Sequence, residues 1–416
     1  MPSKVKNLDR SGTKPQRKGS KIEKNILSKI QLKDSELLFT PRADWFNVPL
    51  PAIDAQAARG QAGLASHVQQ IHQHALSLLE KENEHFATSR QDSSSQKFFS
   101  TVVASGTLSD KVSALTLAVQ ESPVHNVRAL ESLIALSKKR SRTQVIDVLR
   151  ALKDLFAQGS LLPSNRRLYT FATHPIIQKE LGRLQRQKDS EPLTSLPLSP
   201  DRLIVCAYEN WLKEKYFEIL TSLEVWCNDE IEFSRSKATR FVFELLKEKP
   251  EQEANLLRLL TNKLGDPSKK IASQASYLLM EMMSAHPLMK MNIITSIESD
   301  VLFRPGQNLH AKYYAAITLN QTALSGREEE LARKLLDIYF GLFVGLLKPT
   351  QINSKSDPRI SGHRSKRRRT EHSRPTIGTQ EDETREKLVS AVLTGINRAY
   401  PFVSSHNQRY VEKQAR

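Results

Sequence analysis

The sequence predicts an all-α protein in which pairs of helices stack into an α-solenoid. Apolar residues recur at helical spacing through most of the chain, and no stretch shows the strict alternation of a half-buried strand. Turns of a few residues separate successive helices, and glycine is sparse at 15 of 416 residues. Because a helix pair of this kind has two apolar faces and covers only one by itself, it needs neighbours.

The helix pair in residues 251–283 shows this pattern most clearly. Leucines share one face of its first helix, at positions 256, 257, 260 and 264. We expect Gly265 to end this helix, Asp266 to cap the next one, and Pro267 to occupy the first helical position. A second apolar face then continues to Met282. The pair alone is also compatible with one hairpin of a helical bundle, so the neighbouring helices decide between the two.

Those neighbours favour the stack. Helices are expected to begin near residues 109, 123 and 141, and then to cover 201–226, 233–248, 251–264, 267–285, 288–300, 308–323 and 327–348. Residues 158–200 are irregular in pattern, and their Pro- and Ser-rich end predicts a loop. Asp229 and Arg235 resemble the turn aspartate and helix arginine of HEAT repeats, although Ala272 stands where the next such arginine would fall. The fold is therefore predicted to be HEAT-like or armadillo-like.

Five segments are predicted along the chain. They are a disordered basic arm (1–56), an N-terminal helical segment (57–106), the solenoid (107–348), a disordered basic insertion (349–385), and the solenoid resuming but truncated (386–416). No polar capping unit of the kind that closes a solenoid is evident, so the chain is expected to stop inside a domain.

The positive charge is concentrated in two of these segments. Of the net charge of +17, residues 1–30 carry +7 and residues 355–374 carry +6. Segments so polar and so charged do not fold alone. The ordered body is therefore only mildly basic.

The densest charge run, "RSKRRR", predicts a nuclear-import signal or a phosphate-binding patch. Its basic residues are Arg364, Lys366, Arg367, Arg368 and Arg369. A merely solvated charge run is the alternative. The N-terminal arm repeats this chemistry more diffusely, as a possible RNA-contacting arm, with Lys4, Lys6, Arg10, Lys14, Arg17, Lys18 and Lys21. A solubilising tail is an equally good interpretation of the arm.

Other candidate groups favour plain structural roles. The spacing of His67, His72 and His74 does not place three imidazoles on one helical face, so no metal site is expected. Lys269 and Lys270 open a helix and are interpreted as exposed lysines rather than a phosphate site. Four aromatic residues are interpreted as core or inter-repeat packing: Trp211, Tyr216, Phe217 and Trp226.

Several classes of function are disfavoured. Two cysteines, Cys206 and Cys227, have no partners at zinc-ligand spacing and predict a reducing compartment rather than disulfides. No apolar run approaches a membrane span, and no secretory signal is evident. No nucleotide-binding loop, hydrolase elbow or metalloprotease motif occurs. We therefore expect no enzyme, no cofactor, no membrane partner and no small-molecule substrate.

Four blocks of sequence resemble the signature blocks of one family, the CCAAT-binding-factor family. They occur in the family's order, at Ser109–Leu136, Lys249–Leu279, Phe303–Leu324 and Val389–Phe402. The resemblance implies an α-helical scaffold of the nucleus and nucleolus that acts in large (60S) ribosomal subunit assembly and pre-rRNA processing. It also implies binding to pre-rRNA and pre-60S particles, and a heterodimer with a second nucleolar complex protein. Family members continue with a further helical half and an acidic tail.

Two other functions stay open on the sequence alone. The first is a CCAAT-box transcription regulator, although no DNA-reading helix pattern of a familiar kind is present. The second is a nuclear transport adaptor, because HEAT-like solenoids often carry cargo. Neither the rRNA segment that is contacted nor the face that binds the partner follows from the sequence.

Overall fold

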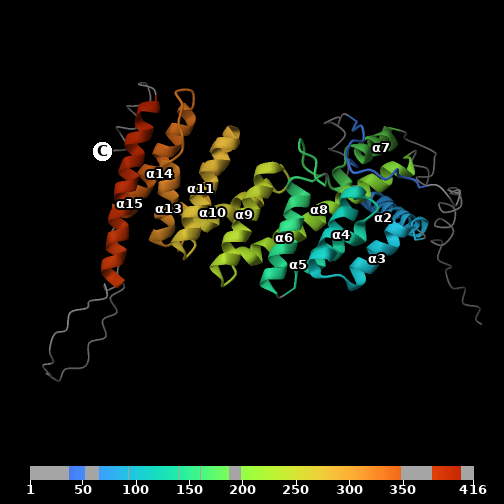
Figure 1. Ribbon diagram of the computed structural model, residues 1–416. Helices are drawn as coiled ribbons and strands as arrows, with labels where there is room; N and C mark the ends of the chain where they lie inside the picture. Colours follow the sequence, from blue (N-terminus) through green and yellow to red (C-terminus); the bar gives the residue numbers. More distant parts are fainter. Residues whose placement is uncertain are drawn as a thin grey trace, which may run out of the picture. The chain divides into compact units, whose positions relative to one another are not determined.

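The computed structural model describes residues 37–51, 65–91, 93–139, 141–159, 161–186, 198–347 and 377–403 (Figure 1). Most of the described residues are helical, and no β-strand occurs among them, so the all-α fold class is confirmed. Most of the predicted arm and of the predicted insertion lies outside the described residues.

The helices succeed one another along the chain with short connections. Their bounds are α2 Ala65–Ser89, α3 Ser94–Ser105, α4 Leu108–Glu121, α5 Val127–Ser137, α6 Arg142–Ala157, α7 Pro175–Arg186, α8 Pro200–Cys227, α9 Glu232–Glu248, α10 Glu253–Asn262, α11 Lys269–Ala285, α12 Lys290–Ile297, α13 Leu309–Asn320, α14 Glu329–Leu347 and α15 Ile377–Ala399. Short 3₁₀ or π turns extend α10 and α12. The helices predicted between residues 201 and 348 are all present, within a few residues of their expected ends.

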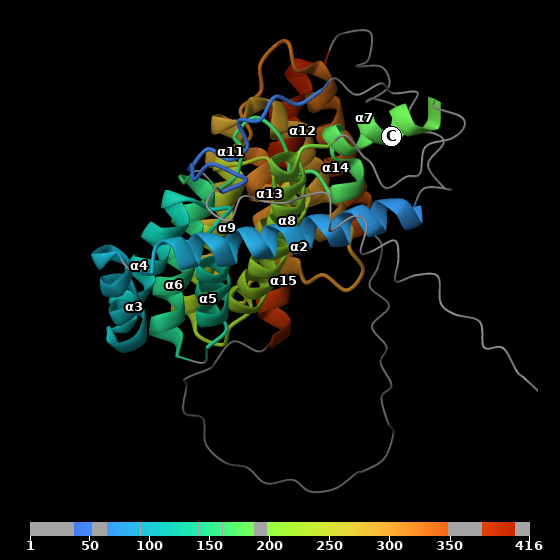
Figure 2. The ribbon, with the colours of Figure 1, turned by 90° about the vertical axis from the view of Figure 1, so that its right-hand side faces the viewer.

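The described chain forms two compact units. The first contains α2, α7 and the first residues of α8, and α2 runs through it as a single long helix (Figure 2). In this unit the backbone N–H of Phe39 donates to the buried carboxylate of Glu82 at 3.0 Å. The ring of His72 packs against Phe171 with centroids 4.5 Å apart.

Helix α7 corrects the prediction that residues 158–200 are irregular. Its buried apolar face consists of Ile176, Ile177 and Leu181, and Pro175 occupies its first position, where a missing N–H costs nothing. The Pro- and Ser-rich sequence that follows α7 masked this short apolar pattern. Only the end of that predicted loop is described, residues 198–200, and Pro200 already belongs to α8.

The second unit is a stack in which many helices pack against their sequence neighbours. Helix α4 packs on α5 and α6, and α9 packs on α10. The second helices of successive pairs also form a series, in which α6 contacts α9, α9 contacts α11, α11 contacts α13, and α13 contacts α15 (Figure 1). Contacts between nearest neighbours in a series are the packing pattern of an α-solenoid.

Two details of the stack differ from expectation. Gly265 lies in a 3₁₀ turn, Lys263–Gly265, that extends α10, and a Cβ added to it would lie 3.2 Å from Ala311 on α13. This glycine therefore allows a close approach of α13 rather than a left-handed helix end. Helix α15 begins at Ile377, inside the predicted insertion 349–385 and earlier than the return of helix expected near residue 384.

Residues 37–51 correct the predicted extent of the disordered arm, which was placed at 1–56. Trp45 is fully buried in the second unit, where its indole Nε1–H donates to the carbonyl of Leu161 at 3.1 Å. Its ring meets the ring of Tyr208 edge to face, with centroids 5.1 Å apart. The polar, basic composition of the arm as a whole concealed this single apolar anchor.

Helix α15 packs against α13 and α14, and Gly395 allows a close approach. A Cβ on Gly395 would lie within 3.0 Å of both the Tyr339 ring and the Asn320 side-chain oxygen. We expect Gly395→Ala to destabilise the second unit by about 1–3 kcal/mol, because a well-packed contact is overfilled. The loss would be measured by urea unfolding and by faster amide exchange in α15. Gly345→Ala in α14 is the matched control, because nothing lies within 4 Å of its added Cβ. The control is expected to be neutral or stabilising, and equal effects of the two substitutions would contradict this account.

Candidate functional site

The basic residues singled out in the sequence lie outside the described residues. This holds for Arg364, Lys366, Arg367, Arg368 and Arg369, and for the whole set in the N-terminal arm, Lys4, Lys6, Arg10, Lys14, Arg17, Lys18 and Lys21. Their assignment to nuclear targeting or RNA contact stays a prediction. The candidate site that the structure does describe is the surface of the helical stack and the polar contacts that hold it.

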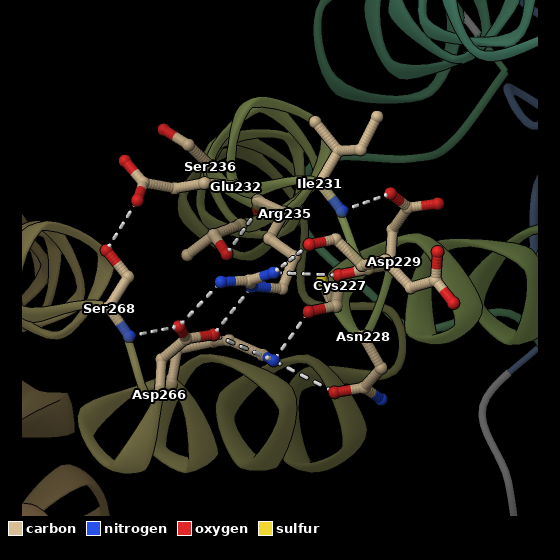
Figure 3. A network of polar contacts seen from close by, with 12 residues as sticks. Cys227, Asn228, Asp229, Ile231, Glu232, Arg235, Ser236, Asp266 and Ser268 are labelled. Atoms are coloured by element: carbon tan, nitrogen blue, oxygen red, sulfur yellow. Dashed lines mark hydrogen bonds and ion pairs between the residues drawn. The ribbon is translucent and has the colours of Figure 1, made fainter.

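The centre of these contacts is a buried ion pair between two successive helix pairs (Figure 3). The Arg235 guanidinium meets the Asp266 carboxylate through Nε at 3.1 Å and Nη2 at 3.2 Å. Its Nη1 donates to the backbone carbonyls of Asp229 and Glu230, both at 2.9 Å. The Asp266 side chain is only 1% exposed. The arginine therefore bridges its own turn and the next one.

A second cation completes this network. The buried Lys263 ammonium lies 3.6 Å from the Asp266 carboxylate and donates to the side-chain oxygen of Asn228 at 2.9 Å. Asp266 Oδ1 also accepts the backbone N–H of Ser268 at 3.0 Å. Helix α11 begins at Lys269 with Ser268 as its cap residue, so the predictions that Asp266 caps this helix and that Pro267 is its first residue are wrong. The Asp266 carboxylate thus pairs with two cations and accepts the backbone N–H that precedes α11. Burial of charges is tolerated where each charge is paired and hydrogen-bonded in this way.

The polar contacts continue on both sides of the central pair. On one side, Asp229 Oδ1 accepts the Ile231 N–H at 2.7 Å, and Arg142 of α6 lies 3.2 Å from the same carboxylate. On the other side, the Ser268 hydroxyl donates to Glu232 at 2.9 Å (Figure 3). The turns of three successive helix pairs are therefore joined by one chain of contacts.

A row of ion pairs also crosses the second helices along their length. Lys153 of α6 lies 2.6 Å from Glu244 of α9, and Lys247 of α9 lies 2.9 Å from Glu281 of α11. Each pair joins a lysine of one helix to a glutamate of the next. The Lys153 side chain is 9% exposed, whereas Lys247 and Glu281 are 33% and 36% exposed, so the second pair is expected to stabilise the fold only weakly.

Two buried glutamates hold an irregular segment against the stack. Glu209 accepts the Tyr169 N–H at 2.7 Å and the Arg166 guanidinium through both its oxygens, while Glu251 accepts the Leu168 N–H at 2.6 Å. The Lys213 ammonium completes the second site, 2.8 Å from Glu251. Backbone amides that lack a helical partner are satisfied here by carboxylates.

The outer surface of α9 and α11 carries exposed aromatic side chains. Phe233 is 57% exposed and Tyr277 is 62% exposed. The Lys237 ammonium lies 5.5 Å from the centroid of the Phe233 ring. Aromatic and basic side chains presented together on a fixed backbone are typical of binding surfaces. This arrangement can bind a partner, but it contains no group placed for catalysis.

The remaining candidates have mixed outcomes. Lys269 and Lys270 are exposed, as interpreted, with Lys270 3.7 Å from Glu232. Tyr216 is fully buried against Phe156, as expected for core packing, whereas the prediction for Phe217 is wrong because this ring is 53% exposed. Helical periodicity alone placed both residues on the same helix, and Phe217 falls on its outer side.

The described residues offer little reactive chemistry. No group of three His, Cys, Asp or Glu side chains able to hold a metal ion occurs among them. Both cysteines are free and buried, and burial raises the pKa of the Cys227 thiol to about 12, which suppresses its reactivity. Within the described part of the chain, no helix is long and apolar enough to cross a membrane.

No family model matches the chain. Individual relatives do. "Ribosome biogenesis protein NOC1" of Chaetomium thermophilum is 47% identical over 379 residues, which cover 89% of this chain and 36% of that protein. "CCAAT/enhancer-binding protein zeta" of Mus musculus is 32% identical, over 89% of this chain and 31% of that protein. The chain belongs to the CCAAT-binding-factor family.

A third family member is "Nucleolar complex protein 1" of Drosophila melanogaster, 31% identical over 66% of this chain and 22% of that protein. The chain spans about a third of the length of the first two of these relatives. The family resemblance drawn from four sequence blocks is thus confirmed.

Sequence reasoning missed most of the contacts that hold this family member together. Asp266 was expected to cap a helix, but its pairing with Arg235 was not foreseen, because Ala272 hid the repeat of the HEAT pattern. The recurrence of an aspartate in two successive turns, at positions 229 and 266, was the available signal. Glu209, Glu251 and Trp45 carried no local signal, since each acts through a partner far away in the sequence.

Proposed function

We propose that this chain is part of a non-catalytic scaffold for ribosome assembly in the nucleolus. The observation that carries the proposal is the 47% identity to a ribosome biogenesis protein over 89% of the chain. A stack of helices joined by buried ion pairs is well suited to this role, because it offers a long surface of fixed geometry to several partners. The exposed aromatic side chains Phe233 and Tyr277 supply contact area on that surface.

In finer detail, the scaffold acts in assembly of the large (60S) subunit and in pre-rRNA processing. The helical stack binds a second nucleolar complex protein, and the two basic segments, residues 1–30 and 355–374, hold pre-rRNA through its phosphates. The family resemblance supports the first part of this proposal, and the charge of the segments supports the second. The run Arg364–Arg369 also serves as the nuclear-import signal.

Sedimentation tests the proposed role directly. A tagged copy of the chain, expressed in fungal cells, is expected to co-sediment with large-subunit precursor particles on a sucrose gradient and to bring down a second nucleolar complex protein. A tagged copy that stays in the soluble fractions at the top of the gradient would overturn the proposal. Enrichment of transport receptors without ribosomal precursors would favour a transport adaptor instead.

RNA binding by the two basic segments makes a separate prediction. Deleting residues 1–30 and 355–374 together is expected to lower affinity for unstructured RNA at low salt by at least about tenfold, because released counterions drive such binding. The slope of log affinity against log salt should fall as well. Electrophoretic mobility shifts over a salt series provide the measurement.

A matched control keeps the net charge of residues 355–374 and changes only the order of their amino acids. A variant with the residues of 355–374 in shuffled order should bind RNA as the unchanged chain does, because phosphate contacts carry no sequence information. Unchanged RNA affinity after deletion of both segments would rule out their role.

The name of the mouse relative favours a second candidate, a CCAAT-box transcription regulator. Reading a base sequence needs a helix or ribbon that presents Arg, Asn or Gln side chains to a DNA groove. Competition between a CCAAT duplex and a scrambled duplex separates the candidates. A scaffold that binds phosphates is expected to prefer neither duplex, whereas a preference above about tenfold would support the regulator.

A further inference from the structure

A groove of ≈ 450 Å³ lies in the second unit between α3, α4, α5 and the first turn of α6. Apolar side chains from three helices line it, among them Val103, Leu108, Leu115 and Leu136. Leu115 of α4 is buried, whereas the other three are partly exposed. The groove therefore has an apolar lining that the chain itself leaves partly uncovered.

Helix α3, one wall of the groove, is unusually poorly covered. It contains two phenylalanines and two valines within twelve residues, yet none of its residues is buried. Phe98 is 73% exposed. A helix this apolar normally buries one face against a neighbour, because that burial is what stabilises an amphipathic helix. The exposed apolar surface of α3 is thus available to an additional partner.

The charged side chains that line the groove are all positive. Lys111 and Lys139 belong to its lining, and no carboxylate does. The Lys111 ammonium donates to the Ala104 carbonyl at 3.1 Å, and no carboxylate of the described residues forms an ion pair with either lysine. The neighbouring acid, Asp110, is engaged in the capping box of α4 with Thr107. An acidic ligand would therefore find two cations free to pair with it.

We infer that this groove docks a short segment of a partner protein that combines bulky apolar side chains with flanking Asp or Glu residues. A leucine-like side chain of the segment packs against Val103, Leu115 and Leu136, and its carboxylates meet Lys111 and Lys139. The volume lies within the range of about 300–1,000 Å³ that is common for ligand sites. The docking is distinct from the proposed RNA contacts, which lie in the two basic segments.

A protein segment fits this groove better than RNA does. Grooves that hold single-stranded RNA combine cations with aromatic rings on which bases stack. The lining here contains no aromatic ring, and its apolar part is aliphatic. The experiment must therefore distinguish binding of a protein segment in the groove from binding of RNA there.

The test is a selection from a displayed library of short random peptides, with the unchanged chain as the target. Ala135 lines the groove and is exposed on α5, so Ala135→Trp fills the groove without entering the core. Peptides that bind the unchanged chain are expected to lose at least about tenfold in affinity on this variant. They should be enriched in Leu, Ile or Phe together with Asp or Glu.

Two further variants sharpen the result. Replacing both Lys111 and Lys139 by Gln should weaken the selected peptides by about tenfold, because their carboxylates lose both partners. Leu117→Glu is the matched control on α4, since Leu117 is 66% exposed and lies outside the groove lining, and it should leave binding unchanged. Equal thermal melting of all variants would show that each one folds.

Selected peptides that bind every variant equally, or a selection that yields no peptide sensitive to Ala135→Trp, would overturn the inference. An oligouridylate whose binding is abolished by Ala135→Trp would assign the groove to RNA and would also overturn it. Neither result would affect the proposed role in ribosome assembly, which sedimentation of the tagged chain tests separately.

Discussion

Asp266→Ala is expected to destabilise the second unit by about 3–5 kcal/mol, because it leaves two buried cations without their shared carboxylate. Arg235 and Lys263 both lie against Asp266, whose side chain is 1% exposed. Lys263 is buried and the Arg235 side chain is only 14% exposed, so water would compensate little for the lost carboxylate. Urea unfolding followed by circular dichroism would measure the loss.

The matched control for this prediction is an exposed ion pair on the same helix as Arg235. Arg240 is 65% exposed and pairs with Glu244 one turn away, at 3.3 Å. Arg240→Ala should cost about 0.2–1 kcal/mol, because solvent screens the pair in both states. Losses of similar size for Asp266→Ala and Arg240→Ala would show that the central network does not hold the stack together.

The consequences of Asp266→Ala should extend beyond stability. The network joins the turns of successive helix pairs, so its loss is expected to free the pair α8–α9 from the pair α10–α11. Amide exchange should then accelerate near residues 227–231 and 266–268 before it does so elsewhere in the unit. A scaffold role needs this junction to be rigid, because partners on either side must be held at a fixed spacing.

Trp45→Ala is the second substitution for which we expect a large effect, a loss of about 3–5 kcal/mol. Trp45 is fully buried, donates to the Leu161 carbonyl and meets Tyr208 edge to face. Its removal leaves a large cavity and an unpaired carbonyl together. Thermal unfolding would measure the loss, and protease cleavage near Arg42 should become faster as the segment is released.

Two further substitutions divide the Trp45 effect into its parts. Trp45→Phe keeps a ring in the cavity but lacks the N–H donor, so the loss should be about 1–3 kcal/mol. Asn47→Ala alters an exposed position of the same segment and should change stability by less than about 0.5 kcal/mol. If Trp45→Ala were as mild as Asn47→Ala, the segment would not be anchored by its indole.

Local sequence pattern predicted the helices of residues 200–347 well, and physical reasons explain why other features escaped it. Periodicity identifies a helix from its own residues, so the helices from α8 to α14 were found with bounds close to those observed. Helix α7 was missed because it is short and is followed by a Pro- and Ser-rich stretch. Trp45 was missed because a single anchor in a basic arm has no period.

The contacts of the candidate site were predicted less well than the helices that carry it. The sequence singled out Asp229 and Arg235, and the structure joins them, with Arg235 Nη1 donating to the backbone carbonyl of Asp229. The actual partner of Arg235, Asp266, lies in the next turn, and only stacking brings the two together. The groove between α3 and α5 has the same origin, since its residues converge only after folding. The basic segments, on which the RNA prediction rests, lie outside the described residues.

Cross-linking in living cells shows whether this chain acts on precursor ribosomes, as we propose. Ultraviolet light would join a tagged copy of the chain to the RNA that it touches, and the captured RNA would be sequenced. We predict that precursor rRNA of the large subunit dominates, and that its share falls when residues 1–30 and 355–374 are deleted. Captured RNA with no enrichment of precursor rRNA over an untagged control would contradict the account.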